Sequence, residues 1–323
     1  MTAQITWVGV DICQAHLDIH ILLSNESFQY PNNISGIKKL IEKLTEFSDV
    51  RVVFESTGGL ERLLVSSLDA AEISMAMVNP RKVRAFATAL GSAKTDALDA
   101  HVIALFAQSL KPEPLVVSNH DSQVFSDLVK RRRQLVSMKV AEQNRLSRAP
   151  QAVKADIEEH IAQLTERIEA LSLAINEQAR QQKDWKRKHK ILLSFPGVGE
   201  VTAALCLAEL PELGQLNEKA MVSDRPLAIA RLVGVAPLNH DSGKHQGKRM
   251  IQGGRAHVRS GLYMAALVAS QKNPIIREFY ERLLKRGKLP KVALTACIRK
   301  TLIILNAMIR DNQLWKAPRE AAS

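Results

Sequence analysis

Short apolar runs alternate with amphipathic segments between residues 5 and 79, and this alternation limits the possible folds more than any other feature of the chain. The pattern predicts strands over 5–11, 17–23, 51–56 and 73–79, and amphipathic helices over 33–48 and 60–70. The first two strands are separated only by a short turn, as in a hairpin. A strand hairpin followed by alternating helices and strands predicts an α/β domain.

The remaining chain is predicted to be mostly helical. Helices are expected over 81–90, 96–109 and 119–147, then from Pro150 to about residue 183, with further helices from 191 onward. Lys111-Pro112-Glu113-Pro114 resembles a domain exit. We therefore expect an α/β domain at 1–112, a coiled coil or helical hairpin at 113–185, and a mostly helical C-terminal domain at 186–323.

A regular apolar seam runs along the helix after Pro150. Its members are spaced alternately four and three residues apart: Ile157, Ile161, Leu164, Ile168, Leu171 and Ile175. This is the a/d pattern of a coiled coil. Two interpretations are open, because the seam could pack within its own domain or pair with a second copy of the chain.

The charge of the chain favours a polyanionic partner. The formal net charge is +12 and the sequence pI is about 9.7. Residues 1–117 have 10 Lys and Arg against 13 Asp and Glu, so the positive excess lies in the rest of the chain. Aromatic residues make up only 4%, which argues against a protein built on base-stacking platforms. Nucleic acid, bound mainly through its phosphates, is the expected partner.

Several classes of protein are not supported by the sequence. The three cysteines, Cys13, Cys206 and Cys297, are far apart, so neither a disulfide framework nor a thiolate zinc site is expected. The first residues, MTAQITWVGVDI, lack the charged and then apolar pattern of a signal peptide. No uninterrupted apolar run reaches the roughly 20 residues of a membrane span. A cytoplasmic protein with no membrane partner is expected.

Four acidic residues stand where they could converge. Asp11 ends the first strand, Glu55 ends the strand RVVFES, and Asp96 and Asp99 share one face at the start of a helix. Singly, each has an ordinary explanation, because turns and first helical turns favour aspartate. Together they would repel each other unless a cation lay among them. Oxygen ligands of this kind suit Mg²⁺ or Mn²⁺, which can act on a phosphodiester.

The stretch LNHDSGKHQGKRMIQGGRAHVRS at 238–260 is rich in glycine and positive charge. Its cations could neutralise a phosphate: Lys244, Lys248, Arg249, Arg255 and Arg259. Ser242 lies near its start, although most serines in glycine-rich loops serve turn chemistry. A nucleophilic serine needs activation, and the general base is open between His240, Asp241 and a group in the acidic quartet.

Two further features could contact nucleic acid. Residues 191–210 contain a helix–PGVG–helix pattern that resembles a helix-hairpin-helix, in which the backbone at Gly197 and Gly199 would meet a DNA phosphate. An ordinary turn between helices would show the same pattern. The cations Arg81, Lys82 and Arg84 follow Asn79-Pro80 near the predicted acidic site, where they could hold a phosphate or form a solvated helix face.

These motifs resemble a known family. WVGVDICQAHLDIHIL, VVFESTGG and KTDALDA resemble the RuvC-like, ribonuclease-H-fold domain of the DEDD transposases of insertion-sequence family 110/1111, to which the Piv-type invertases are related. The resemblance continues through FPGVGEVTAALCLAEL, LVGVAPLNHDSGKHQGKRMIQGGRAHVRSGLYMA and KVALTACIRKTLIILNAMIRD, and covers nearly the whole chain. The acidic motifs are short, whereas the block at 232–265 is long and specific.

The resemblance implies an RNA-guided recombinase. Asp11, Glu55, Asp96 and Asp99 occupy the four metal-binding positions of the family, and Ser242 occupies the position of its serine nucleophile. It implies Mg²⁺ or Mn²⁺ as cofactor, donor and target DNA as substrates, and a noncoding guide RNA that pairs with both. It also implies a homodimer, formed through the coiled coil, that assembles into a homotetramer.

Three functions are therefore open. The first is an RNA-guided recombinase that uses Ser242 together with the acidic quartet. The second is a RuvC-like endonuclease that needs the quartet but no serine chemistry. The third is a nucleic-acid-binding protein without enzymatic activity, in which the acids are structural. A sugar-kinase or actin-like ATPase is not supported, because Ile12-Cys13 follow Asp11 where that group needs glycines.

Overall fold

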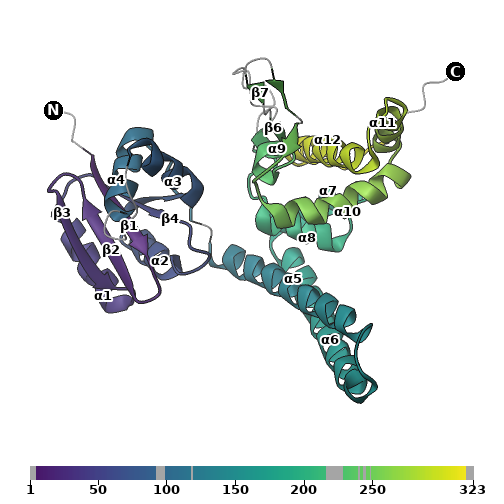
Figure 1. The fold of residues 1–323 in the computed structure, drawn as a ribbon, viewed down its shortest axis with the longest axis horizontal. Coiled ribbons are helices and arrows are strands. Elements are labelled where there is room, and N and C mark those ends of the chain that lie inside the picture. The colour runs from purple at the N-terminus through teal and green to yellow at the C-terminus, as the bar shows by residue number, and fades with distance from the viewer. Residues whose placement is uncertain are drawn as a thin grey trace. The chain divides into compact units, whose positions relative to one another are not determined.

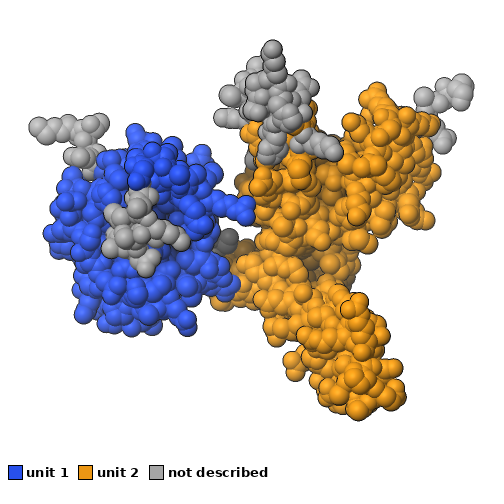
Figure 2. Space-filling model, viewed as in Figure 1, with its two compact units in different colours: residues 1–118 blue, residues 119–323 orange. Residues whose placement is uncertain are grey.

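The chain forms two compact units, residues 1–118 and 119–323 (Figure 2). The computed structural model describes residues 5–91, 99–117, 119–215, 228–238, 241–242, 245–247 and 249–317. Each unit has its own apolar packing.

The N-terminal unit is built on one five-stranded mixed sheet (Figure 1). Its strands are β1 (Thr6–Ile12), β2 (His16–Ile21), β3 (Glu26–Pro31), β4 (Val50–Glu55) and β5 (Ser74–Val78), in the spatial order β3-β2-β1-β4-β5. β2 runs antiparallel to β1 and β3, whereas β1, β4 and β5 are parallel. The carboxyl ends of these three parallel strands therefore lie at the same end of the sheet.

Helices cover both faces of the sheet. α1 (Ile34–Leu44) and α2 (Arg62–Ala70) share a core with the even-numbered residues of β1 and β4, such as Val10 and Phe54. α3 (Pro80–Ala89) and α4 (Asp99–Leu110) share the opposite core with Trp7 and Val53. Because successive side chains of a strand point to opposite faces, the odd-numbered residues of β1 and β4 lie on the α4 side.

The α/β character predicted for this part of the chain is confirmed. The described strands and helices lie within a few residues of their predicted bounds, but the prediction lacked β3. This edge strand half-buries only Phe28 and Tyr30, and its other residues are exposed. Two apolar residues in six were too few to indicate a strand.

The C-terminal unit begins with a helical hairpin of α5 (His120–Leu146) and α6 (Gln151–Gln181), which pack against each other. Of the apolar seam in α6, Leu164 and Ile175 are buried, and the other four members are half-buried. Within one chain the seam is therefore part of a hairpin. Leu173 of α6 is 72% exposed, so an apolar side chain on this helix is available for contact with a second copy. Pairing with a second copy stays a proposal.

The rest of this unit packs around one apolar core. Its helices are α7 (Lys183–Ser194), α8 (Glu200–Glu209), α9 (Ala228–Val233), α10 (Ala256–Lys272), α11 (Pro274–Lys285) and α12 (Pro290–Arg310). Among the described helices, α12 has the length and composition to cross a membrane. Ten of its residues are buried, six of them in this core, and Arg299 and Lys300 interrupt its apolar sequence, so α12 has the pattern of a core helix.

Candidate active site

Asp11 and Glu55 are neighbours at the carboxyl ends of two parallel strands. Gly9 of β1 is in register with Val53 of β4, and two residues further along each strand lie Asp11 and Glu55. Val53 packs in the core beneath α4, so both acids lie on that face of the sheet. Both residues are half-buried. This pair of hard oxygen donors fits a divalent cation such as Mg²⁺ or Mn²⁺.

The start of α4 lies directly on β1. A Cβ on Gly9 would come within 2.0 Å of Ala100 O and 2.6 Å of Ala104 N, so the helix backbone touches the strand. Asp99 immediately precedes Ala100 and is the first residue of α4. The side chain of Asp99 and the whole of Asp96 lie outside the described residues.

The structure thus brings two of the four predicted acids together and lays the beginning of α4 over the same strand. Among the residues it describes, no three His, Cys, Asp or Glu side chains gather as a metal site. The fourfold site therefore stays a prediction that depends on Asp96 and Asp99.

Another acid, missed in the sequence, lies on the same face. Asp18 of β2 is the register partner of Asp11, so their side chains share a side of the sheet. The Asp18 carboxylate accepts a hydrogen bond from Gln29 Nε2 at 2.8 Å and lies 3.1 Å from His16 Nε2. The polar residues alternating with apolar ones in HLDIHI were the available signal.

His20 extends this polar row beneath α4. Its Nδ1 lies 2.7 Å from Ser27 Oγ, and its Nε2 lies 2.8 Å from His101 Nδ1. Burial, and secondly the proximity of His101, lowers the pKa of His20. His20 is therefore neutral at physiological pH. Its contact with His101, two residues after Asp99, joins β2 to α4.

The turn after Glu55 is held by a carboxylate. Glu61 Oε2 accepts hydrogen bonds from Gly59 N at 2.9 Å and from the backbone and hydroxyl of Thr57. Burial opposes ionisation of Glu61, but these hydrogen bonds lower its pKa on balance. Gly58 and Gly59 have φ values of 82° and 139°, which side-chain-bearing residues rarely adopt. The chain next to Glu55 is thereby fixed in one conformation.

Three predicted phosphate contacts lie at the same end of the sheet. Arg81, Lys82 and Arg84 are exposed on α3. α3 starts where β5 ends, and β5 is parallel to β4, so the start of α3 and the end of β4 share that end. The Asn79 side chain accepts a hydrogen bond from Arg81 N at 2.9 Å and caps the helix.

In the C-terminal unit, Ser242 lies on the inner of two short β-ladders. β6 (Pro237–Leu238) pairs with β9 (Met250–Ile251), and between them along the chain β7 (Asp241–Ser242) pairs with β8 (His245–Gln246). Ser242 is in register with His245. The Ser242 side chain, Lys244 and Lys248 lie outside the described residues, and Arg249 is exposed.

Arg255 and Arg259, predicted to contact nucleic acid, have partners inside the protein. Arg255 makes a two-pronged ion pair with Glu212, at 2.7 and 2.8 Å, and donates to Glu209 O at 2.6 Å. Arg259 Nη1 donates to the carbonyls of Val233, Gly234 and Gly253. A contact with nucleic acid stays a prediction for both.

A helix–turn–helix of α7 and α8 lies where the PGVG pattern predicted it. Gly197 turns inward, because a Cβ there would come within 2.7 Å of Ala265 O on α10. Gly199 is exposed, and a Cβ there would meet no atom within 4 Å. Glu200 follows in the first turn of α8 and lies 2.9 Å from the buried His189 Nε2. Of the two glycines, only Gly199 is open to a phosphate.

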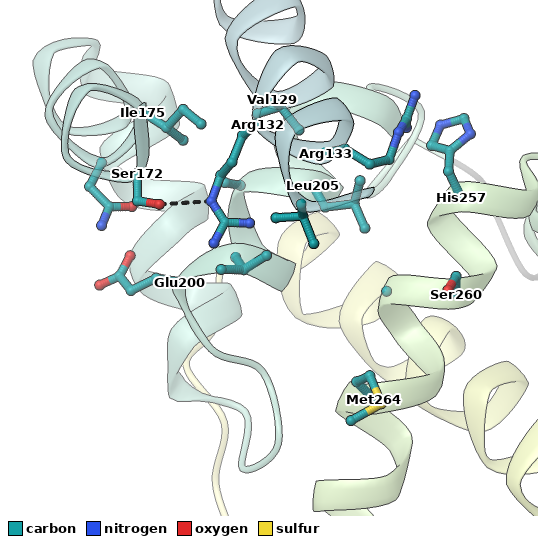
Figure 3. Close-up of a pocket in the computed structure, with 15 residues that line it drawn as sticks. Val129, Arg132, Arg133, Ser172, Ile175, Glu200, Leu205, His257, Ser260 and Met264 are labelled. Carbon is teal, nitrogen blue, oxygen red and sulfur yellow. Dashed lines mark hydrogen bonds between the residues drawn. The ribbon is translucent and has the colours of Figure 1, made fainter. Parts of the chain in front are cut away.

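A pocket of about 470 Å³ lies between α5, α6, α8 and α10 (Figure 3). Its walls are mainly apolar and include Val129, Leu205 and Met264. Arg132 Nε donates to Ser172 Oγ at 2.7 Å within it, and burial lowers the pKa of Arg132. Sequence patterns gave no sign of this pocket, because its lining comes from four separate helices.

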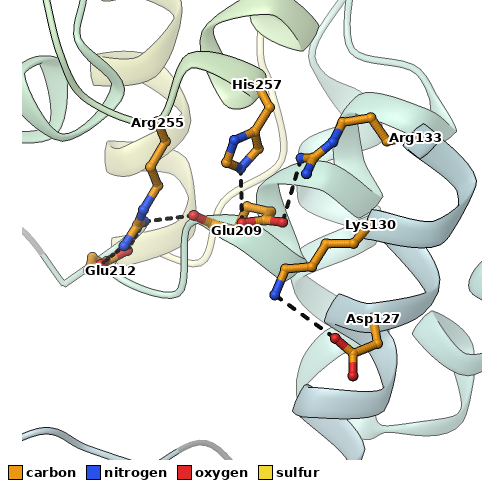
Figure 4. Close-up of polar contacts among 7 residues, drawn as sticks. All are labelled: Asp127, Lys130, Arg133, Glu209, Glu212, Arg255 and His257. Atoms are coloured by element: carbon orange, nitrogen blue, oxygen red, sulfur yellow. Dashed lines mark hydrogen bonds and ion pairs between the residues drawn. The ribbon is translucent and has the colours of Figure 1, made fainter. Parts of the chain in front are cut away.

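Glu209, at the end of α8, contacts both α10 and α5 (Figure 4). Its carboxylate lies 3.0 Å from His257 Nε2 and 3.9 Å from Arg133, and its side chain is 11% exposed. Burial would raise the pKa of Glu209, but His257 and the charges of Lys130 and Arg133 lower it on balance. The α8 end is thereby tied to the helix that follows the serine segment.

Both units match transposase families. Residues 8–152 match the DEDD transposases of the IS110 type, and residues 189–281 match the family described as transposase IS116/IS110/IS902. The chain is thus similar to IS110-type transposases in two separate stretches. The first match includes Asp11, Glu55, Asp96 and Asp99. The second includes Ser242, Arg255 and Arg259.

Several proteins are similar to this chain over part or most of its length. It is 26% identical over 319 residues to the pilin gene-inverting protein of Moraxella bovis, covering 95% of this chain and 97% of that protein. It is 32% identical over 160 residues to the insertion element IS900 uncharacterized 42 kDa protein of Mycobacterium paratuberculosis, covering 48% and 38% of the two chains. The IS116 44.8 kDa protein of Streptomyces clavuligerus is 24% identical, with 96% of each chain covered. Transposases of this kind cut and rejoin DNA.

Proposed function

We propose that the chain is an RNA-guided DNA recombinase of an insertion sequence, in which Ser242 attacks DNA and the acidic quartet acts with a divalent metal. The observation that carries the proposal is the pairing of Asp11 with Glu55 at adjacent strand ends, on the face that the start of α4 covers. The order of strand hairpin, acidic strand end and D-x-x-D segment supports a RuvC-like, ribonuclease-H-type fold for this unit.

Asp11, Glu55, Asp96 and Asp99 would hold the metal ion. Mg²⁺ or Mn²⁺ bound there would supply Lewis-acid stabilisation of negative charge on a phosphate. The cations of α3, Arg81, Lys82 and Arg84, would hold the DNA backbone beside these acids. Their exposure and their place at the carboxyl end of the sheet support this role.

Ser242 would supply the nucleophile. Its Oγ attacks phosphorus, the hydroxyl proton passes to a base, a phosphoserine ester forms, and one DNA oxygen leaves and takes up a proton. A hydroxyl of the new partner strand then attacks the phosphoserine, which releases Ser242 and restores a phosphodiester. This exchange conserves the number of phosphate ester bonds. One relative is named a pilin gene-inverting protein, and inverting a gene requires that both cut ends be rejoined.

Lys244, Lys248 and Arg249 on the serine segment, and the exposed backbone at Gly199, would bind phosphates of DNA or guide RNA. The positive excess beyond residue 117 supports a long polyanionic partner. A homodimer through the α5–α6 hairpin, assembling to a tetramer, would let the acidic and serine halves come from different subunits. The exposed Leu173 supports such an interface.

A strand-exchange assay tests the proposal. The full-length protein, Mg²⁺, the noncoding RNA that flanks the element and DNA with the joined ends of the element would be mixed with target DNA. We expect both Ser242→Ala and Asp96→Asn to abolish joined products. Cut but unjoined products that survive Ser242→Ala would favour the hydrolytic endonuclease, and full activity of Asp96→Asn would reject the acidic metal site.

A further inference from the structure

The two ends of the segment that carries Ser242 meet at one point. Gly234, near its start, has a φ of 77°, and Gly253 and Gly254, near its end, have φ values of 71° and 65°. A Cβ on Gly254 would come within 2.2 Å of Gly234 N, so the two backbones are in direct contact. Arg255 N also donates to Leu232 O at 2.9 Å. The segment is therefore closed at its base.

Arg259 holds this junction from the side of α10. Its Nη1 donates to Val233 O at 3.0 Å and Gly234 O at 3.3 Å on one side, and to Gly253 O at 2.8 Å on the other. One half-buried guanidinium thus joins both ends of the serine segment. A lysine would keep the charge, but its side chain is one bond shorter and would not carry a donor to the place of Nη1.

Arg255 fixes the same junction to α8. Its guanidinium is held by both oxygens of Glu212, and it donates to the backbone of Glu209, the last residue of α8 (Figure 4). Burial opposes ionisation of Glu212, but the hydrogen bond and charge of Arg255 lower the pKa of this carboxyl on balance. The pair is therefore ionised at neutral pH, and charge-assisted two-pronged contacts of this kind fix orientation.

We propose that Arg259, Arg255 and Glu212 are positioning residues that set the direction in which the segment presents Ser242 to DNA. This inference rests on the proposed function of Ser242 as nucleophile. Nucleophilic attack requires the reacting atom to be held to within about 0.5 Å, and this junction fixes where both ends of the segment leave the helices. The guanidinium groups of Arg255 and Arg259 are here directed to acceptors within the protein.

The test compares Arg259→Ala, Arg259→Lys and Glu212→Gln with matched controls in the full-length protein. Arg286→Ala removes one exposed cation at the C-cap of α11, and Glu281→Gln removes one exposed acid on that helix. The measurements are the single-turnover rate of covalent adduct formation with labelled junction DNA, the DNA Kd at several salt concentrations, the thermal midpoint, and the rate of tryptic cleavage after Arg249.

Arg259→Ala and Glu212→Gln should slow adduct formation by about 10–100-fold, while the DNA Kd changes less than about threefold. Arg259→Lys should recover only part of the rate, because charge alone does not rebuild the junction. Cleavage after Arg249 should be faster by about tenfold in Arg259→Ala, which reports the junction directly and without catalysis. Both controls should match the wild-type protein.

Three results would overturn the inference. An unchanged adduct rate and tryptic rate in Arg259→Ala would show that the junction does not position the serine. A weaker Kd with a salt slope reduced by about one, rescued by Arg259→Lys, would show a phosphate contact instead. Tighter DNA binding in Glu212→Gln than in Glu281→Gln, with an undiminished adduct rate, would assign Arg255 to DNA. Ser242→Ala, run alongside, separates these outcomes from failure of the proposed function, since product formation by that variant would reject the serine chemistry itself.

Discussion

Replacing Gly9 with alanine would test whether the contact between β1 and α4 sets the geometry of the acidic site. The added Cβ would lie 2.0 Å from Ala100 O, whereas ordinary contact begins at 3.4 Å, so one partner must move by about 1.4 Å. β1 is paired with β2 on one side and β4 on the other, so we expect the helix to move rather than the strand. Overpacking of this kind costs about 1–3 kcal/mol.

The same movement would carry Asp99 away from Asp11 and Glu55. A displacement of about 1 Å in an active site can cost about 100-fold in rate. We therefore expect Gly9→Ala to lower Mg²⁺-dependent DNA cleavage by about 100-fold while the unit remains folded, since typical domains have about 5–15 kcal/mol of stability. Single-turnover cleavage of labelled DNA and thermal unfolding would be measured on the same preparation.

Gly36→Ala is the matched control. A Cβ on Gly36 would also lie 2.0 Å from a backbone oxygen, that of Pro31, but at the start of α1 on the other face of the sheet. It should lower the thermal midpoint similarly and change the cleavage rate of the folded protein by less than about threefold. Equal rate losses in the two variants, or a Gly9→Ala protein as active as wild type, would show that the contact between β1 and α4 does not set the geometry of the acidic site.

Three other predictions follow from the C-terminal unit. Leu173→Glu should lower the mass measured by light scattering without lowering the thermal midpoint, because this side chain is exposed in the single chain; an unchanged mass would exclude an interface there. Glu209→Gln should cost about 1–3 kcal/mol at pH 7. The pKa of Glu209 lies below the usual 4.5, so its contribution to stability is present above that pH and is lost as the pH falls through the lowered value. The variant should therefore lose less stability than wild type below about pH 4.5. Free energies of urea unfolding that fall equally in the two proteins from pH 7 to 3 would contradict this. Gly197→Ala should destabilise the fold by about 1–3 kcal/mol, because φ is 114° and α10 is in contact. Gly199→Ala should leave stability unchanged and weaken DNA binding by about tenfold. If filter binding and thermal melts showed that Gly199→Ala destabilises the fold and Gly197→Ala only weakens DNA binding, the inward place of Gly197 and the outward place of Gly199 would be rejected.

The regular elements could be predicted because burial repeats along the sequence. Strand β1 shows a continuous apolar run, and α6 shows a heptad spacing, so local pattern and final structure agree. β3 could not be recognised, since an edge strand with one half-buried face carries little apolar signal. The partner of the α6 seam was equally inaccessible, because a heptad pattern does not tell α5 of the same chain from a second copy.

The candidate site was predictable in part for a related reason. Asp11 and Glu55 end strands, so their convergence followed once the strands were known to be parallel neighbours. Asp18 was missed although the alternation in HLDIHI was visible, because its place beside Asp11 depends on the register of β2 against β1. Arg255 and Arg259 bind a carboxylate and carbonyls of other parts of the chain. These partners cannot be recognised from charge composition, which predicted both arginines to contact nucleic acid.

The most direct test of Ser242 as the nucleophile is covalent trapping of the protein on DNA. Wild type, Ser242→Ala and Asp96→Asn would be mixed with Mg²⁺, the flanking noncoding RNA and labelled junction DNA, then denatured in detergent and separated on a gel. We expect a labelled protein–DNA band in wild type that is absent from both variants. Metal-dependent cut products without any covalent band, persisting in Ser242→Ala, would contradict serine chemistry and leave a RuvC-like endonuclease.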